Sequence, residues 1–151
     1  EPLGLPPVKF GYREPGDREG VLSWDAVGDA TGSTMSYNEV MVPGVSGDEL
    51  EAIYINMDSN VLMEFKKKSK NPSEESLALA DKKYWTSIYF HTLFLYSITK
   101  KRGFTISQRG ENDDEEIIDV GQYLKDVFDH HYSSFILNFG GAEEMMAGLE
   151  G

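Results

Sequence analysis

Cysteine is absent from this chain of 151 residues, and its absence removes several kinds of chemistry. Disulfides, thiolate metal sites and cysteine nucleophiles are all excluded. The sequence also lacks a Gly-x-Ser-x-Gly segment, a phosphate-binding loop and a dinucleotide-binding fingerprint. We therefore expect a protein that is not an enzyme and that needs no cofactor.

Targeting signals are also missing from the sequence. The first residues, EPLGLPP, contain neither a basic start nor an apolar core segment, so they do not read as a secretory signal. No uncharged apolar run reaches the roughly 18 residues that indicate a membrane span. We expect an intracellular setting, cytoplasm or virus particle, and no membrane contact. Because the chain does not begin with Met, we expect either a processed chain or a piece of a longer protein.

What the sequence does contain is a stretch without any charged residue, YWTSIYFHTLFLYSIT, from Tyr84 to Thr99. As a helix this stretch is about 24 Å long and apolar on all sides, which is typical of a buried helix. Asn71, Pro72 and Glu74 suit the start of such a helix, and the basic residues 100–102 followed by Gly103 suit its end. We expect one long helix at the centre of the fold.

Residues 46–65 carry two competing patterns. Ser46 followed by Glu49 matches a capping box, and apolar residues then recur at helical spacing. The same apolar residues also alternate on both sides of Asp58-Ser59-Asn60, as they would in a β-hairpin. We prefer a helix because of the cap, and the hairpin stays open as the alternative.

Two further regions complete the predicted body. Residues 104–109 alternate and suit one strand, and a third helix is predicted over 112–139. The apolar stripe of this third helix is spaced for one face and comprises Ile117, Val120, Leu124, Val127, Phe128, His131 and Phe135.

Proline and glycine are concentrated before residue 48, which rules out a long helix there. Val21–Trp24 and Glu39–Val42 are the strand candidates in this region. We predict an irregular arm with short strands at 1–45, a helical body at 46–139 and a flexible tail at 140–151. The expected fold is mainly α with a small β element: a bundle of about three helices around a buried central helix, preceded by this Pro/Gly-rich arm.

Histidine is the first place to look for a metal. His91 and His131 lie on helices that are predicted to pack together, and Asp126 offers a carboxylate. No His-Glu-x-x-His or similar spaced pair is present, so these three residues are weak candidates and we expect no metal. The spacing Asp29-x-Thr31-x-Ser33 is similar to the metal-binding signature of von Willebrand A-type domains, but only this short segment matches and a polar loop is the simpler interpretation.

The net charge of −12 is unevenly distributed, with −5 over residues 1–48, +2 over 49–102 and −9 over 103–151. This acidity opposes general binding to phosphate backbones. Nucleic acid contact is expected only through two basic clusters, which comprise Lys66, Lys67, Lys68 and Lys70 in one and Lys100, Lys101 and Arg102 in the other.

Three helices cannot enclose a helix that is apolar on every side, so other surfaces must cover it. We expect a partner protein, from the same or a different chain, to contact Phe90, Leu93 and Phe94 on the central helix and Trp24 and Tyr37 in the arm. The leading hypothesis is a non-catalytic interaction or assembly subunit of a larger complex. The alternatives are an accessory domain of a nucleic-acid-processing complex and a small metal-dependent enzyme that uses His and Asp.

Overall fold

A computed structural model describes residues 5–102, 107–109, 115–117 and 125, with the backbone alone at 98–102, 107–109 and 115–117. The chain runs through strands β1 (Val8–Tyr12) and β2 (Val21–Ser23), helix α1 (Trp24–Thr31), strands β3 (Met41–Ser46) and β4 (Glu49–Asn56), and helices α2 (Asn60–Lys67) and α3 (Glu74–Arg102). Strands β5 (Ser107–Arg109) and β6 (Glu115–Ile117) form a separate antiparallel pair.

A mixed four-stranded sheet is the centre of the fold, with strand order β2-β1-β4-β3. β1 is parallel to both of its neighbours, while β3 and β4 form an antiparallel hairpin. Gly47 allows the tight turn of this hairpin because its φ of 59° is one that residues with a Cβ rarely adopt. Pro43 is tolerated inside β3 because β3 is an edge strand, where one side of the backbone needs no ladder hydrogen bond.

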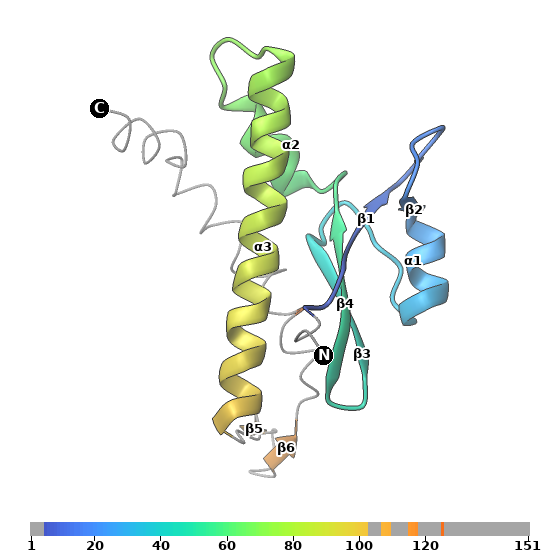
Figure 1. Ribbon diagram of the computed structural model, residues 1–151, viewed down its shortest axis with the longest axis vertical. Coiled ribbons are helices and arrows are strands. Elements are labelled where there is room, and N and C mark those ends of the chain that lie inside the picture. The colour runs from blue at the N-terminus through green and yellow to red at the C-terminus, as the bar shows by residue number, and fades with distance from the viewer. Residues whose placement is uncertain (1–4, 103–106, 110–114, 118–124, 126–151) are drawn as a thin grey trace, which may run out of the picture.

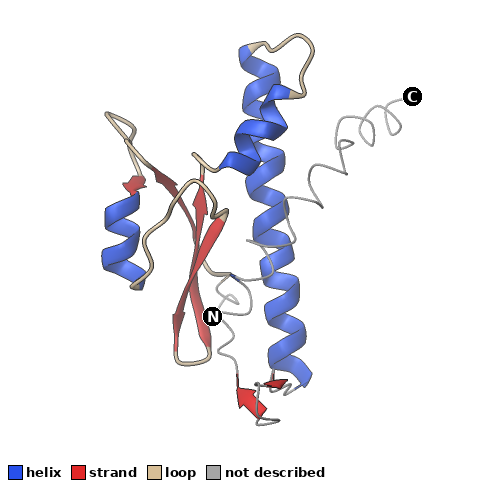
Figure 2. Ribbon diagram, turned by 180° about the vertical axis from the view of Figure 1, so that it is seen from behind, coloured by secondary structure: helices blue, strands red, loops and turns tan. Residues whose placement is uncertain are grey.

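Helices cover both faces of the sheet, which gives three layers (Figure 1). Successive residues of β4 point to opposite faces. Ile53, Ile55 and Met57 pack in the cluster that also contains residues of α2 and α3. Ala52 and Tyr54 pack with α1 on the other face. Seen from behind, α1 and α3 again lie on opposite sides of the sheet (Figure 2).

Local signals explain where the helices begin and end. The hydroxyl oxygens of Ser23 and Ser59 accept hydrogen bonds from backbone N–H groups in the first turns of α1 and α2. At the start of α3, Ser73 and Ser76 cap each other, because each backbone N–H donates to the hydroxyl of the other residue. α1 ends at Gly32, whose φ of 81° is left-handed.

The prediction of a mainly helical bundle is wrong, because the structure is an α/β fold built on the mixed sheet. The region predicted as an irregular arm with short strands contains β1 and β2 and also helix α1, which was not expected there. The proposed boundary after residue 45 falls inside β3. Gly11 shows how tightly the first residues are packed: a Cβ there would lie 2.6 Å from the sulfur of Met35.

Neither interpretation of residues 46–65 is correct. This region contains the hairpin turn, strand β4 and helix α2 in succession. The hairpin turn lies at Gly47 rather than at 58–60, and Ser59 caps a helix instead of leading into a strand. The strand predicted at Val21–Trp24 is confirmed as β2, although Trp24 already belongs to α1.

The long helix is confirmed as α3, with 29 residues from Glu74 to Arg102. Its role as a helix enclosed by other helices is wrong, because it lies on the sheet and faces outward on its other side. None of the helices in the described part combines the length and the apolarity that crossing a membrane requires. The predicted third helix lies largely outside the described residues, and at 115–117 the chain forms β6. The predicted tail, 140–151, lies outside them entirely.

Candidate functional site

A buried asparagine organises the end of β4. Asn56 is fully buried, and its amide nitrogen donates to the carbonyl oxygens of Ser36 and Glu39 at 2.7 Å each. Its side-chain oxygen accepts from Trp24 Nε1 and from the backbone N–H of Asp58, at 3.0 Å each. Both donors and the acceptor of this amide are therefore used in holding loops, and the group has a structural role.

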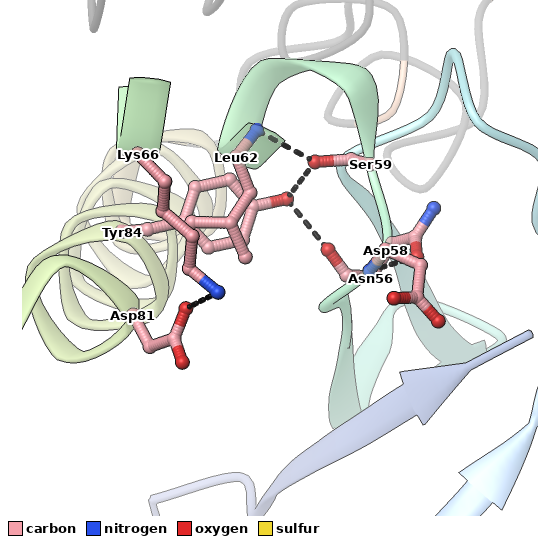
Figure 3. A network of polar contacts seen from close by, with 7 residues as sticks. All are labelled: Asn56, Asp58, Ser59, Leu62, Lys66, Asp81 and Tyr84. Carbon is pink, nitrogen blue, oxygen red and sulfur yellow. Dashed lines mark hydrogen bonds and ion pairs between the residues drawn. The ribbon is translucent and has the colours of Figure 1, made fainter. Parts of the chain in front are cut away.

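The hydroxyl of Tyr84 connects this strand end to the helices (Figure 3). It donates to the backbone oxygen of Asn56 at 2.8 Å and lies 2.7 Å from Ser59 Oγ, which accepts from the backbone N–H of Leu62 at 3.1 Å. Tyr84 and Ser59 are both buried. The network thus joins β4, the cap of α2 and the middle of α3, and it fixes how the two helices sit on the sheet.

Trp24 and Tyr37, two of the expected partner-binding residues, come together beside this network. Their rings meet edge to face with centroids 5.0 Å apart. Arg13 Nη1 donates to the Tyr37 hydroxyl at 3.0 Å, and the Arg13 guanidinium lies 5.8 Å from the Tyr37 ring centroid. Tyr37 remains 40% exposed, while Trp24 is partly buried through its packing and its bond to Asn56.

The other three expected partner-binding residues lie on α3 and divide between its two sides. Leu93 packs against the core. Phe90 and Phe94 point away from the sheet and are 61% and 62% exposed to solvent, as far as the described residues cover them. Leu79, at 43% exposure, lies on the same side because the spacing of 79, 90 and 94 returns to one face of a helix. We call Leu79, Phe90 and Phe94 the α3 outer face.

The two basic clusters are far apart. Lys66–Lys70 lie at the end of α2 and in the turn that follows, whereas Lys100–Arg102 form the last residues of α3, at the end of that helix far from the turn (Figure 1). Lys66 pairs with Asp81 at 2.6 Å and Lys67 with Glu64 at 3.5 Å. The clusters therefore do not combine into one continuous basic surface.

Only part of the proposed metal set can be located. His91 lies on α3 and is partly buried, while His131 and Asp126 lie outside the described residues. In the part of the chain that the structure describes, no group of three or more His, Asp and Glu side chains is placed to hold a metal ion. Asp29, Thr31 and Ser33 lie around the end of α1, where the Thr31 hydroxyl donates to the backbone oxygen of Val27.

Two tyrosines titrate above their ordinary range. Burial raises the pKa of Tyr12, and the Arg18 guanidinium, 4.1 Å from the ring centroid, partly opposes this rise. Burial also raises the pKa of Tyr89, whose hydroxyl donates to the backbone oxygen of Pro6 at 2.6 Å. Both hydroxyls therefore stay protonated near neutral pH, so neither is suited to act as a base.

Sequence reasoning missed Asn56, Arg13 and Lys83. The contacts of Asn56 with Trp24 and of Arg13 with Tyr37 join residues more than 20 positions apart, and no local pattern marks either residue. Lys83 stood outside the runs of basic residues that were singled out, yet it lines the same pocket as Lys66 and Lys68.

Comparison with known protein families, with curated proteins and with solved structures finds no match to this chain.

Proposed function

We propose that this chain is a non-catalytic interaction domain that associates with a second copy of itself through the α3 outer face. The observation that carries this proposal is the exposure of Phe90 and Phe94, at 61% and 62%, one turn apart on the same side of a helix. Large aromatic side chains are enriched at the centres of protein interfaces because they bury much area at a low entropic cost.

Charge favours a second copy as the occupant of this face. Two chains that each carry −12 repel one another over most of their surfaces. Residues 84–99 contain no charged side chain, so two copies can meet there without placing like charges opposite each other. A basic partner would find no carboxylate in this stretch to pair with.

Symmetry and size support a weak dimer. In a twofold contact the same patch is used by both copies, so Phe90 of one chain can pack on Phe94 of the other. With about 60% of each ring exposed, the two rings offer roughly 250 Å² per copy. A standard interface needs about 800 Å² per partner, so Leu79 and neighbouring residues must contribute the remainder and the affinity should be low.

Sedimentation equilibrium of the full chain tests this proposal over concentrations from about 1 μM to 1 mM. The mass should rise from 17.0 kDa toward twice that value as the concentration increases. The variant Phe90→Ser/Phe94→Ser should stay at the monomer mass. The control Met63→Ser removes a side chain of 42% exposure on α2 and should behave like the wild type.

A wild-type chain that remains monomeric throughout this range would contradict self-association. So would a double variant that associates as strongly as the wild type. Circular dichroism of all variants establishes that any loss of association is not caused by unfolding.

A further inference from the structure

The segment that precedes β1 is held against α3. The Tyr89 hydroxyl donates to the backbone oxygen of Pro6 at 2.6 Å, although the two residues are 83 positions apart. The backbone oxygen of Pro7 accepts from the backbone N–H of Ile53 on β4 at 3.0 Å. Residues 6 and 7 are therefore fixed by both the sheet and the helix.

β1 and α3 run in opposite directions along this side of the helix. The ring of Phe10 meets the ring of Trp85 edge to face, with centroids 5.3 Å apart. Pro6, four residues earlier in the chain than Phe10, contacts Tyr89, which is four residues later than Trp85. Going back along the chain from β1 thus means advancing along α3, which places Leu5 toward the C-terminal half of that helix.

Tyr89 connects this segment to the α3 outer face. Its ring meets the ring of Phe90 edge to face, with centroids 5.4 Å apart. Tyr89 is 9% exposed and Phe90 is 61% exposed, so the border between the buried and the outer side of α3 runs between them. Leu5, next to Pro6, is 67% exposed. Two exposed apolar side chains therefore neighbour one buried tyrosine, Phe90 through its ring and Leu5 through Pro6.

The proposed dimer needs more apolar area than the two aromatic rings supply. Phe90 and Phe94 offer roughly 250 Å² per copy, against about 800 Å² in a standard interface. Among the large apolar side chains of the described residues, Leu5 has the highest exposed fraction. It is uncharged, so an identical chain can cover it without bringing like charges together.

We propose that Leu5 belongs to the interface with the second copy, beside Phe90, and that Tyr89 positions it there by holding Pro6. This inference rests on the proposed self-association through α3. A side chain on an irregular segment loses conformational freedom when an interface covers it, and this loss lowers the affinity. Because the hydrogen bond from Tyr89 already fixes the neighbouring backbone, less freedom is lost on association.

Sedimentation equilibrium of the full chain tests the role of Leu5. Leu5→Ser should weaken self-association by about tenfold, as expected for a leucine that is exposed in the single chain and covered in the dimer. Met63→Ser is the matched control, because it removes another exposed apolar side chain, on α2. This control should associate within about twofold of the wild type, since it lies outside the interface.

Tyr89→Phe separates positioning from packing, because it keeps the ring that meets Phe90 and removes only the hydroxyl. It should weaken self-association by about threefold in the wild-type background. In the Leu5→Ser background it should have no further effect, because the hydrogen bond then positions no interface side chain. A role of Tyr89 in the fold alone would give the same loss in both backgrounds.

The outcomes distinguish this inference from the proposed function on which it rests. A wild-type chain that dimerises, together with a Leu5→Ser variant that associates equally strongly, would overturn the role of Leu5 and leave self-association through α3 in place. An equal effect of Tyr89→Phe with and without Leu5 would overturn the positioning role. A wild-type chain that stays monomeric would overturn both proposals. Circular dichroism of each variant checks that the fold is unchanged.

Discussion

Replacing Tyr84 by Phe should destabilise the fold although it removes a single oxygen atom. The Tyr84 hydroxyl bonds to the backbone oxygen of Asn56 at 2.8 Å and to Ser59 Oγ at 2.7 Å, and the ring is 1% exposed. The variant keeps the ring and makes no large cavity. It leaves two buried oxygens with fewer partners, which should cost about 1–3 kcal/mol of the free energy of unfolding.

Urea unfolding followed by circular dichroism measures this loss, with the slope m expected to stay unchanged. Tyr54→Phe is the matched control, because Tyr54 is 7% exposed and no hydrogen bond of its hydroxyl is found within the described part of the chain. It should lose less than about 0.5 kcal/mol. Equal losses in the two variants, or no loss in Tyr84→Phe, would refute the role assigned to the network.

A double-mutant cycle with Ser59→Ala isolates the contact between the two hydroxyls. Ser59 also caps α2 through the backbone N–H of Leu62, so Ser59→Ala alone should cost about 1–3 kcal/mol. If the hydroxyls interact as the structure places them, the two changes together should cost less than the sum of the single losses, by about 0.5–1.5 kcal/mol.

Three further variants test the packing, a helix end and a titration. Leu62→Ala removes a core side chain of 1% exposure and should cost about 2–5 kcal/mol in urea unfolding. Gly32→Ala places a Cβ at a φ of 81° and should cost about 1 kcal/mol in the same assay. Burial raises the pKa of Tyr89 above 10.0, so the stability contributed by its neutral hydroxyl is complete below pH 10 and is lost as the pH rises through the folded-state pKa. Tyr89→Phe should therefore reduce the loss of stability at alkaline pH. An alkaline unfolding curve that is the same in the variant and the wild type would contradict this assignment.

Sequence reasoning located α3 because its signals are local. The acidic first turn, the basic last turn and the long uncharged stretch all act within one element. Even so, the expected start included Asn71 and Pro72, whereas the helix begins at Glu74 and is capped by Ser73 and Ser76. Strand β2 was also found, since a short apolar run follows Gly20 directly.

The sheet could not be found in the same way, because its order depends on contacts between distant segments. β1 pairs with β4 across more than 40 residues, and nothing near Val8 indicates this partner. β4 is central and buried on both faces over residues 52–56, so apolar residues occur at successive positions and the pattern fitted a helix as well as a strand. The spacing of Ile53, Met57 and Val61 then imitated a helix that continues across the end of β4.

The residues proposed to bind partners show the same difference between signals within one element and contacts between distant segments. Phe90 and Phe94 were identified as residues in need of cover because the helix itself is too apolar for its surroundings; both are exposed, and their contact with a partner stays a prediction. The contact of Tyr37 with Trp24 and Arg13 arises only when loops from three parts of the chain meet. The pocket lined by Lys66, Lys68 and Lys83 depends on where α2 ends against α3, and the helix expected within residues 46–65 had other bounds.

The most direct test of self-association through α3 uses a single introduced thiol in this cysteine-free chain. Ser97 is exposed and shares the face of Phe90 and Phe94, being seven and three residues further along the helix. The rate at which Ser97→Cys reacts with a thiol reagent should fall as protein concentration rises, while the rate for Ser46→Cys, exposed at the end of β3, should stay constant. A Ser97→Cys rate that is independent of concentration, whether fast or slow, would contradict a second copy at this face.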